Sequence, residues 1–181
     1  AHFILSLLPK APFMSPWGTN TYTSTKITAT EAEIIKYGGN VHFVRKVNLA
    51  NALALLCGAM EKDLRQSGMV EYGVNYENVR LGMAADYRIG DSHLDVDHGG
   101  YRGVGGFCFP KDLDAFIAHL DAQGLGECAD LLRKDHEFNV KLLAEQGLTL
   151  EDVSVHDHEW VQKKLEALKD NTGKSPVWQN T

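Results

Sequence analysis

Cysteine, proline and clustered positive charge are all scarce in this 181-residue chain. None of the three cysteines has Cys-x-x-Cys spacing, which argues against a disulfide framework or a structural zinc site and favours a reducing, cytoplasmic location. Lys and Arg number 18 against 24 Asp and Glu, so the chain lacks the cation excess that nucleic acid or an anionic membrane requires. The longest apolar run near the N-terminus, residues 3–8, is too short for a signal sequence or a membrane span.

Strand-like alternation is also rare, and the sequence predicts a mostly α fold with a long central helix and shorter helices packed around it. Residues 1–29 hold three of the five prolines and are predicted to be an extended lead-in or linker. From residue 30 to about residue 65, apolar residues recur at threes and fours, which indicates a long amphipathic helix. The Thr30-x-x-Glu33 spacing predicts a capping box at its start. Gly38-Gly39 interrupts the helix and suggests close packing or ligand approach.

Shorter helices are predicted in the rest of the chain. Residues 74–83 form one, capped by Asn75, and the glycine-rich stretch 88–107 is expected to be a loop. After Pro110, apolar residues recur at helical spacing in two successive segments, which predicts two helices. A final helix is predicted to be capped by Thr149 or Asp157. We expect one helical central domain over residues 30–170 and a frayed tail over 171–181.

The glycine-rich loop ends at Cys108, which has the surroundings of a nucleophile. Proline is favoured in the first turn of a helix, so Pro110 places Cys108 at or just before a helix N-terminus. Free N–H groups and the helix dipole there stabilise a thiolate, the nucleophilic form of cysteine. Asp112, one turn further on, is placed to hold a water molecule or a proton for the same reaction. The alternative is a tight turn with an inert buried cysteine; by contrast, Cys57 and Cys128 are expected to be shielded within apolar helical stripes.

Lys36 and Asn40 are four residues apart and therefore share one face of the long helix, with Asn51 three turns beyond Asn40. Beside Gly38-Gly39, a lysine and an asparagine can donate hydrogen bonds to an oxyanion. A solvated helix face contains the same residue types, so the pair indicates chemistry only together with the Cys108 segment.

Two other patterns favour plain structural interpretations. The glycines at 103–106 follow no strand and lie in no βαβ unit, so they are not a dinucleotide fingerprint. The residues from His93 to His98 and from His156 to Glu159 include metal-ligand types, but neither spacing matches a known coordination geometry. A polar loop and a helix N-terminus with capping acids explain these two segments, and no metal site is predicted.

Three motifs, in order along the chain, resemble UDP-glucose 6-dehydrogenase and related nucleotide-sugar dehydrogenases. They are EIIKYGGN at 33–40, continuing to Lys46 and Asn51, then NYENVR at 75–80 with RIG at 88–90, and GGFCFPKD at 105–112. The resemblance covers roughly residues 28–122. It implies a domain like the dimerisation domain of 6-phosphogluconate dehydrogenase. In the family this domain joins an N-terminal Rossmann domain that binds NAD to a C-terminal α/β domain that binds the nucleotide.

The resemblance also implies a reaction and roles for particular residues. The family oxidises the sugar C6 alcohol to a carboxylate in two NAD-dependent steps, through a thiohemiacetal and a thioester on the cysteine. Carried over, Cys108 is the nucleophile, Lys36 and Asn40 stabilise the oxyanion and position water, and Asp112 assists proton transfer. The remaining residues that the resemblance implies are Arg88, which reaches the sugar in the neighbouring subunit's site, Gly105 and Gly106 for substrate binding, and Lys111 for cofactor binding.

The chain also departs from the family pattern. No Rossmann domain precedes residue 30, Ala52 stands where the family has an acidic residue, and the loop at 91–102 is longer than usual. No complete nucleotide-binding domain aligns beyond residue 122. We therefore expect a central-domain fragment that dimerises through its long helix, is inactive alone without a cofactor of its own, and binds a UDP-sugar only with the missing domains. The alternative is a non-catalytic helical dimerisation or interaction module derived from that family.

Overall fold

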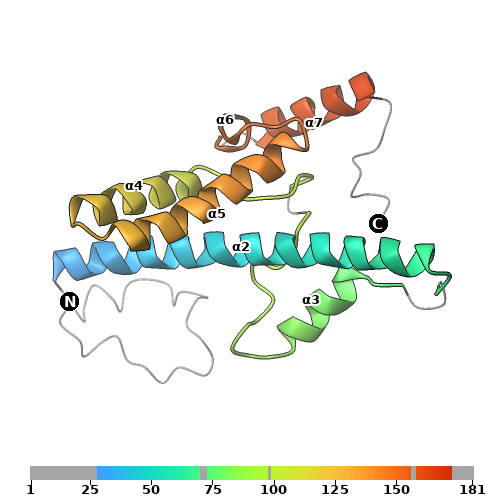
Figure 1. The fold of residues 1–181 in the computed structure, drawn as a ribbon. Helices are drawn as coiled ribbons and strands as arrows, with labels where there is room; N and C mark the ends of the chain where they lie inside the picture. Colours follow the sequence, from blue (N-terminus) through green and yellow to red (C-terminus); the bar gives the residue numbers. More distant parts are fainter. Residues whose placement is uncertain (1–27, 70–72, 98, 156–157, 173–181) are drawn as a thin grey trace, which may run out of the picture. The chain divides into compact units, whose positions relative to one another are not determined.

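The fold is known from a computed structural model, which describes residues 28–69, 73–97, 99–155 and 158–172. Within these ranges the chain is helical and contains no strand, so the predicted mostly α fold class is confirmed. The helices are α2 (Ala29–Gln66), α3 (Tyr76–Ala84), α4 (Cys108–Ala122), α5 (Gly126–Ala144), α6 (Leu150–Val153) and α7 (His158–Thr172) (Figure 1). Most of the predicted lead-in and tail lies outside the described residues.

The chain divides into two compact units, residues 1–35 and residues 36–181. In the first unit, Thr28 and Glu31 form the capping box of α2. The Thr28 backbone N–H donates to Glu31 Oε2 at 2.6 Å, and the Glu31 backbone N–H donates to Thr28 Oγ1 at 3.2 Å. The predicted box at Thr30 and Glu33 is therefore wrong. The sequence TATEAE offers the same spacing twice, and the earlier pair starts the helix.

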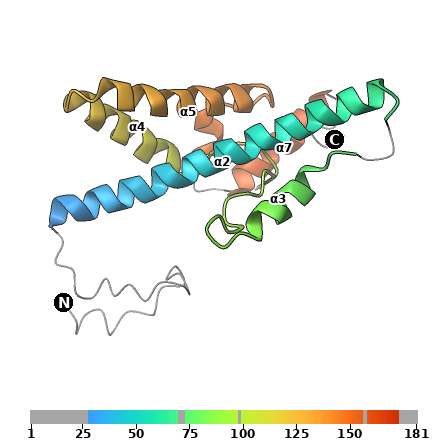
Figure 2. The same cartoon turned by 60° about the horizontal axis from the view of Figure 1, so that its bottom comes forward.

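In the second unit, α2 packs on α4 and α5 through one cluster of buried apolar side chains. Its buried members are Val41, Val44, Val104, Leu113 and Leu132. Helices α4 and α5 follow each other in the chain and pack against each other, diverging away from the turn that joins them (Figure 2). Because Val104 belongs to the glycine-rich loop, this cluster fixes the loop against three helices just before Cys108.

A second apolar cluster joins the end of α5 to α6 and α7. It contains Leu143, Leu148, Val153, Val161 and Leu165. The predicted capping role of Thr149 is confirmed, because its hydroxyl accepts from the Asp152 backbone N–H and Asp152 accepts from the Thr149 backbone N–H. However, Thr149 caps the four-residue α6 and not the final helix. The alternative cap, Asp157, lies outside the described residues.

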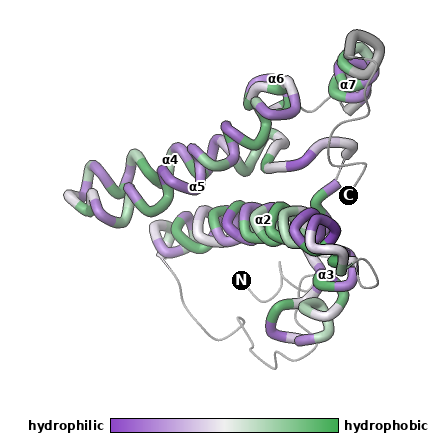
Figure 3. Tube along the Cα trace, turned by 45° about the vertical axis from the view of Figure 1, so that its right-hand side comes forward, coloured by the Kyte–Doolittle hydropathy of each residue, from purple (hydrophilic) through white to green (hydrophobic). Residues whose placement is uncertain are grey.

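Helix α2 carries exposed as well as buried side chains along its length. In the second unit its large exposed apolar residues are Leu49, Leu55, Leu56 and Met60, and Figure 3 shows hydrophobic and hydrophilic positions interspersed along the helix. By length and composition alone α2 passes as a possible membrane span. Its buried positions, however, include Asn48 and Asn51, which hydrogen-bond to Asp135 and Arg102 as residues of a core helix do.

The paired glycines of α2 were predicted to allow either close packing or the approach of a ligand. A Cβ atom added at Gly38 or at Gly39 would meet no atom within 4 Å in the described structure. No described residue therefore packs closely on these glycines, and the approach of a ligand stays a prediction.

Candidate active site

Cys108 is the first residue of α4, as Pro110 predicts, and it is exposed. The N-cap residue is Phe107, and no side chain caps this helix end. The first N–H groups of a helix have no partner within the helix. The turn before Cys108 requires a glycine, because Gly106 has a φ of 76° while its N–H donates to the Val153 carbonyl at 2.8 Å. The nucleophile candidate thus stands at an open helix N-terminus on a fixed turn.

Asp112, one turn into α4, is fully buried and gathers the predicted donors around its carboxylate. Lys36 Nζ lies 2.8 Å from Asp112 Oδ2, and Asn40 Nδ2 donates to the same oxygen at 2.5 Å. Lys111 Nζ donates to Oδ1. The pairing brings the α2 face to the start of α4 across more than 70 residues of sequence. Lys36 and Asn40 therefore lie on one helix face, as predicted, and both hold Asp112.

The electrostatics of this cluster keep both charges in place at neutral pH. Burial acts to raise the pKa of Asp112, but hydrogen bonds from Lys111, Lys36 and Asn40 outweigh it and lower that pKa to about 2. The pKa of Lys36 is raised, first by its hydrogen bond to Asp112 and then by the charge of that carboxylate. Lys36 is therefore a permanent cation beside the sulfur, and Asp112 is a permanent anion.

The glycines before Cys108 make room for neighbouring side chains of the protein itself. A Cβ at Gly105 would lie 2.0 Å from Tyr101 Oη, and one at Gly103 would lie 2.8 Å from Asn139 Oδ1. Asn139 in turn binds both backbone groups of Val104. Two of the glycines are thus explained by packing of the loop against Tyr101 and α5.

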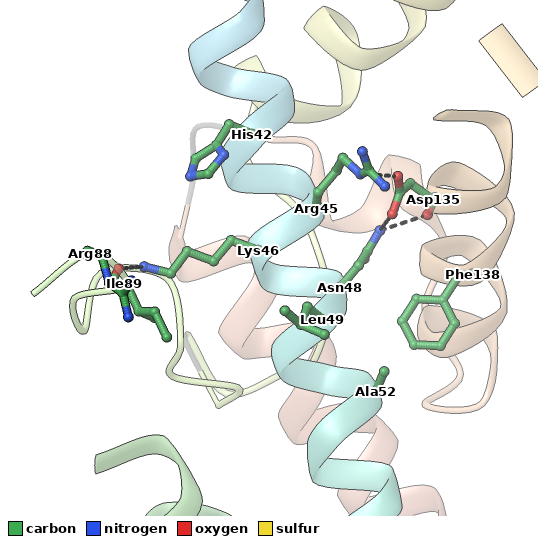
Figure 4. Close-up of a pocket in the computed structure, with 10 residues that line it drawn as sticks. All are labelled: His42, Arg45, Lys46, Asn48, Leu49, Ala52, Arg88, Ile89, Asp135 and Phe138. Carbon is green, nitrogen blue, oxygen red and sulfur yellow. Dashed lines mark hydrogen bonds and ion pairs between the residues drawn. The ribbon is translucent and has the colours of Figure 1, made fainter. Parts of the chain in front are cut away.

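Arg88 occupies a different place from the Cys108 cluster. It is paired with Asp86 and its side chain is 74% exposed. It lines a hollow of about 650 Å³ on α2, where Lys46 Nζ donates to the carbonyl oxygens of Ile89 at 2.7 Å and Gly90 at 3.0 Å (Figure 4). None of its described contacts joins Arg88 to the Cys108 cluster.

Part of the chain matches a known protein family. Residues 66–141 match the UDP-glucose/GDP-mannose dehydrogenase family, central domain. The resemblance found in the motifs is confirmed. The match covers less than half of the chain.

Two similar proteins are named UDP-glucose 6-dehydrogenase. The UDP-glucose 6-dehydrogenase of Haloferax volcanii is 37% identical over 114 residues, covering 63% of this chain and 22% of that protein. The UDP-glucose 6-dehydrogenase of Pseudomonas aeruginosa is 38% identical over 94 residues, covering 52% and 17%. An uncharacterized protein of Methanocaldococcus jannaschii matches over 79% of the chain at 28% identity. The chain spans about a fifth of the length of the first two relatives. No solved structure matches significantly.

The described residues also make contacts that the sequence did not indicate. Asn51, predicted to share the face of Asn40, is buried and accepts from Arg102 Nε at 3.0 Å. His93 has a φ of 65° and stacks on Phe43 with 4.2 Å between ring centroids. The described residues contain no group of three or more His, Cys, Asp or Glu side chains placed to hold a metal ion. His98, His156 and Asp157 lie outside them.

Cys57 and Cys128 differ from each other in exposure. Cys57 is buried on α2, as expected. Cys128 is exposed and lies in the first turn of α5, so the expectation that it is shielded is wrong. The adjacent Leu131 and Leu132 explain the error, because Leu131 is exposed and only Leu132 faces the core.

Proposed function

We propose that this chain supplies the cysteine-bearing part of the active site of an NAD-dependent UDP-glucose (nucleotide-sugar) 6-dehydrogenase. That enzyme oxidises the sugar C6 alcohol to a carboxylate through a thioester on Cys108. One observation carries the proposal: Lys36 and Asn40 converge on Asp112 one turn from the exposed Cys108 sulfur. The relatives named UDP-glucose 6-dehydrogenase support the choice of substrate class.

Two steps belong to residues of this chain. The Cys108 thiolate adds to the carbonyl carbon of a C6 aldehyde, and the carbonyl oxygen becomes an oxyanion that Lys36 and Asn40 stabilise. Later, water adds to the thioester carbonyl and releases its protons to solvent, the C–S bond breaks, the sulfur leaves as the thiolate, and the sugar C6 becomes a carboxylate. The same two donors stabilise the oxyanion that forms in this second addition.

The two oxidations need a hydride acceptor, which NAD supplies when bound. The described residues contain no strand and hence no Rossmann unit, and Lys111, which the resemblance assigns to NAD, donates to Asp112. These residues do not form an NAD site, and we assign no oxidation step to them. The chain alone is therefore proposed to be inactive in NAD reduction, with a UDP-sugar bound only when the other domains are present.

Asp112 is better suited to positioning than to proton transfer. A carboxylate with a pKa of about 2 is a weak base at neutral pH. It instead fixes Lys36 and Asn40 at the start of α4, one turn from Cys108. This refines the proton-transfer role that the resemblance implies.

We also propose that the chain is a cytoplasmic homodimer formed through α2. Leu49, Leu56 and Met60 are exposed on one face of α2, and the Gly38-Gly39 stretch is open. Such a stripe is stabilised when a symmetry mate buries it. The exposed Arg88 is then free to reach the neighbouring subunit's site. Sedimentation should show a dimer for the natural chain and a monomer for the Leu56→Glu variant. A natural chain that is monomeric at high concentration contradicts this.

The same stripe favours the second candidate function, a non-catalytic dimerisation module without thioester chemistry. The activated ester p-nitrophenyl acetate separates the two, because it acylates a reactive thiol without any cofactor. We expect a burst of about one p-nitrophenolate per chain, absent in Cys108→Ser and retained in the matched Cys128→Ser. Deacylation should slow about tenfold or more in Lys36→Met, since removing one oxyanion donor costs roughly that or more. A burst that survives Cys108→Ser refutes the catalytic proposal.

A further inference from the structure

A second hollow, of about 320 Å³, lies between α2, α3 and the loop that precedes Cys108. It is separate from the Cys108 cluster and from the hollow in Figure 4, and it shares no lining residue with either. Its walls include Cys57 of α2, Tyr76 of α3 and Arg102 of the loop, together with Asn75, Glu77, Asp95 and Asp97. Its volume is at the small end of the range for ligand pockets.

Arg102 is the unusual member of this lining, because it is a buried charge without an ionic partner. Its residue is only 7% exposed. The Nε atom donates to Asn51 Oδ1 at 3.0 Å and Nη2 donates to the Asn51 carbonyl at 3.2 Å, both neutral oxygens. Within the described part of the chain, no carboxylate lies within ion-pair distance of its guanidinium.

The position of Arg102 is fixed by its own backbone. Its N–H donates to Gln146 Oε1 at 2.8 Å, and its carbonyl accepts from Gln146 Nε2 at 2.8 Å. Burial lowers the pKa of Arg102, and the charges of Tyr76, Asp97 and Glu145 only partly oppose that. A buried cation is costly unless it is paired, and this one is held rigidly with N–H groups left over.

We propose that this hollow binds a small organic monocarboxylate, which forms a two-pronged ion pair with the guanidinium of Arg102. A carboxylate matches the planar fork of arginine and completes the ion pair that the protein leaves open. Glu77, Asp95 and Asp97 also line the hollow and repel every anion, a monocarboxylate least and anions of higher charge more strongly. They therefore select against phosphate and polyphosphate. The proposal does not depend on the proposed dehydrogenase function.

The test follows the side-chain Nε–Hε signal of Arg102 by NMR in the full 181-residue chain labelled with ¹⁵N-arginine. Sodium acetate is the probe, with sodium chloride at equal ionic strength and sodium phosphate as comparators. We expect a saturable shift of the Arg102 signal with acetate, little shift with chloride and a weaker response to phosphate. In Arg102→Lys, the backbone amide of Val96, which also lines the hollow, should no longer respond to acetate. In the matched control Arg133→Lys, an exposed arginine elsewhere, it should still respond.

A second variant covers the case in which Arg102→Lys fails to fold. Asp97→Asn removes the nearest acidic charge from the exposed loop and should tighten acetate binding about two- to fivefold. The site is refuted if acetate shifts Arg102 no more than chloride does. It is also refuted if Asp97→Asn abolishes the acetate response, because Asp97 would then be needed to build the hollow. A stronger response to phosphate than to acetate overturns the ligand class.

Discussion

Two buried charged residues, Asp112 and Arg102, lie against α2, one in each half of the helix, and they differ in whether their charge is paired. Asp112 is surrounded by Lys36, Lys111 and Asn40, so its negative charge is balanced within the chain. Arg102 is held only by neutral oxygens of Asn51. In both places an asparagine of α2 hydrogen-bonds to the charged residue: Asn40 binds Asp112 of α4, and Asn51 binds Arg102 of the loop. The charge of Asp112 is balanced by lysines of the same chain, whereas the charge of Arg102 has no carboxylate partner among the described residues and is proposed to pair with a bound anion.

The largest expected effect comes from removing the two asparagines in turn. Asn51→Ala should cost about 2–3 kcal/mol, because it leaves the buried Arg102 without a side-chain acceptor. Asn40→Ala should cost only about 1 kcal/mol, because Asp112 keeps both lysines. Urea unfolding at neutral pH measures both. Equal costs would show that charge balance does not distinguish the two clusters.

Acid should weaken the balanced cluster. The pKa of Asp112 is lowered to about 2 from an ordinary value of 3.8, so its contribution to stability is complete above about pH 4 and is lost as the pH falls through 2. The shift corresponds to at most about 2 to 3 kcal/mol, and less where solvent screens the half-exposed lysines. Unfolding measured from pH 5 to pH 2 should be less pH-dependent in Asp112→Asn than in the natural chain. Asp63→Asn, at an exposed position of α2, is the control and should leave the slope unchanged.

The smallest effect concerns the three cysteines. Iodoacetamide at neutral pH should label the exposed Cys108 well before the buried Cys57. Cys128 is the informative comparison, because it is also exposed in the first turn of a helix but follows Glu127 instead of facing a lysine. Lys36→Met should slow labelling of Cys108 by roughly two- to fivefold and leave Cys128 unchanged. If mass spectrometry shows Cys128 reacting first, Lys36 does not activate Cys108.

The features that could be predicted from sequence are mostly local ones. The Asn75 cap, the long helix and the start of α4 follow from spacing and capping rules that act within one or two turns. The family motifs placed Lys36, Asn40 and Asp112 in one site, but the hydrogen bonds of Lys36 and Asn40 to Asp112 were not predicted, because no local rule joins residues so far apart. The contact of Arg102 with Asn51 could not be predicted. It joins a glycine-rich loop to a helix face 51 residues away, and a lone arginine in a polar loop gives no signal of burial.

The turn at Gly106 also bears on how the gene can be shortened. The family match runs from residue 66 to residue 141, and a clone trimmed to it would begin at the last residue of α2. Such a clone would lack both Lys36 and Asn40, and it would also lack Val153, whose carbonyl accepts from the Gly106 N–H. Useful cloning boundaries therefore lie before the Thr28 cap and after α7. Variants made in the matched segment alone would all lack these contacts and would not be expected to fold.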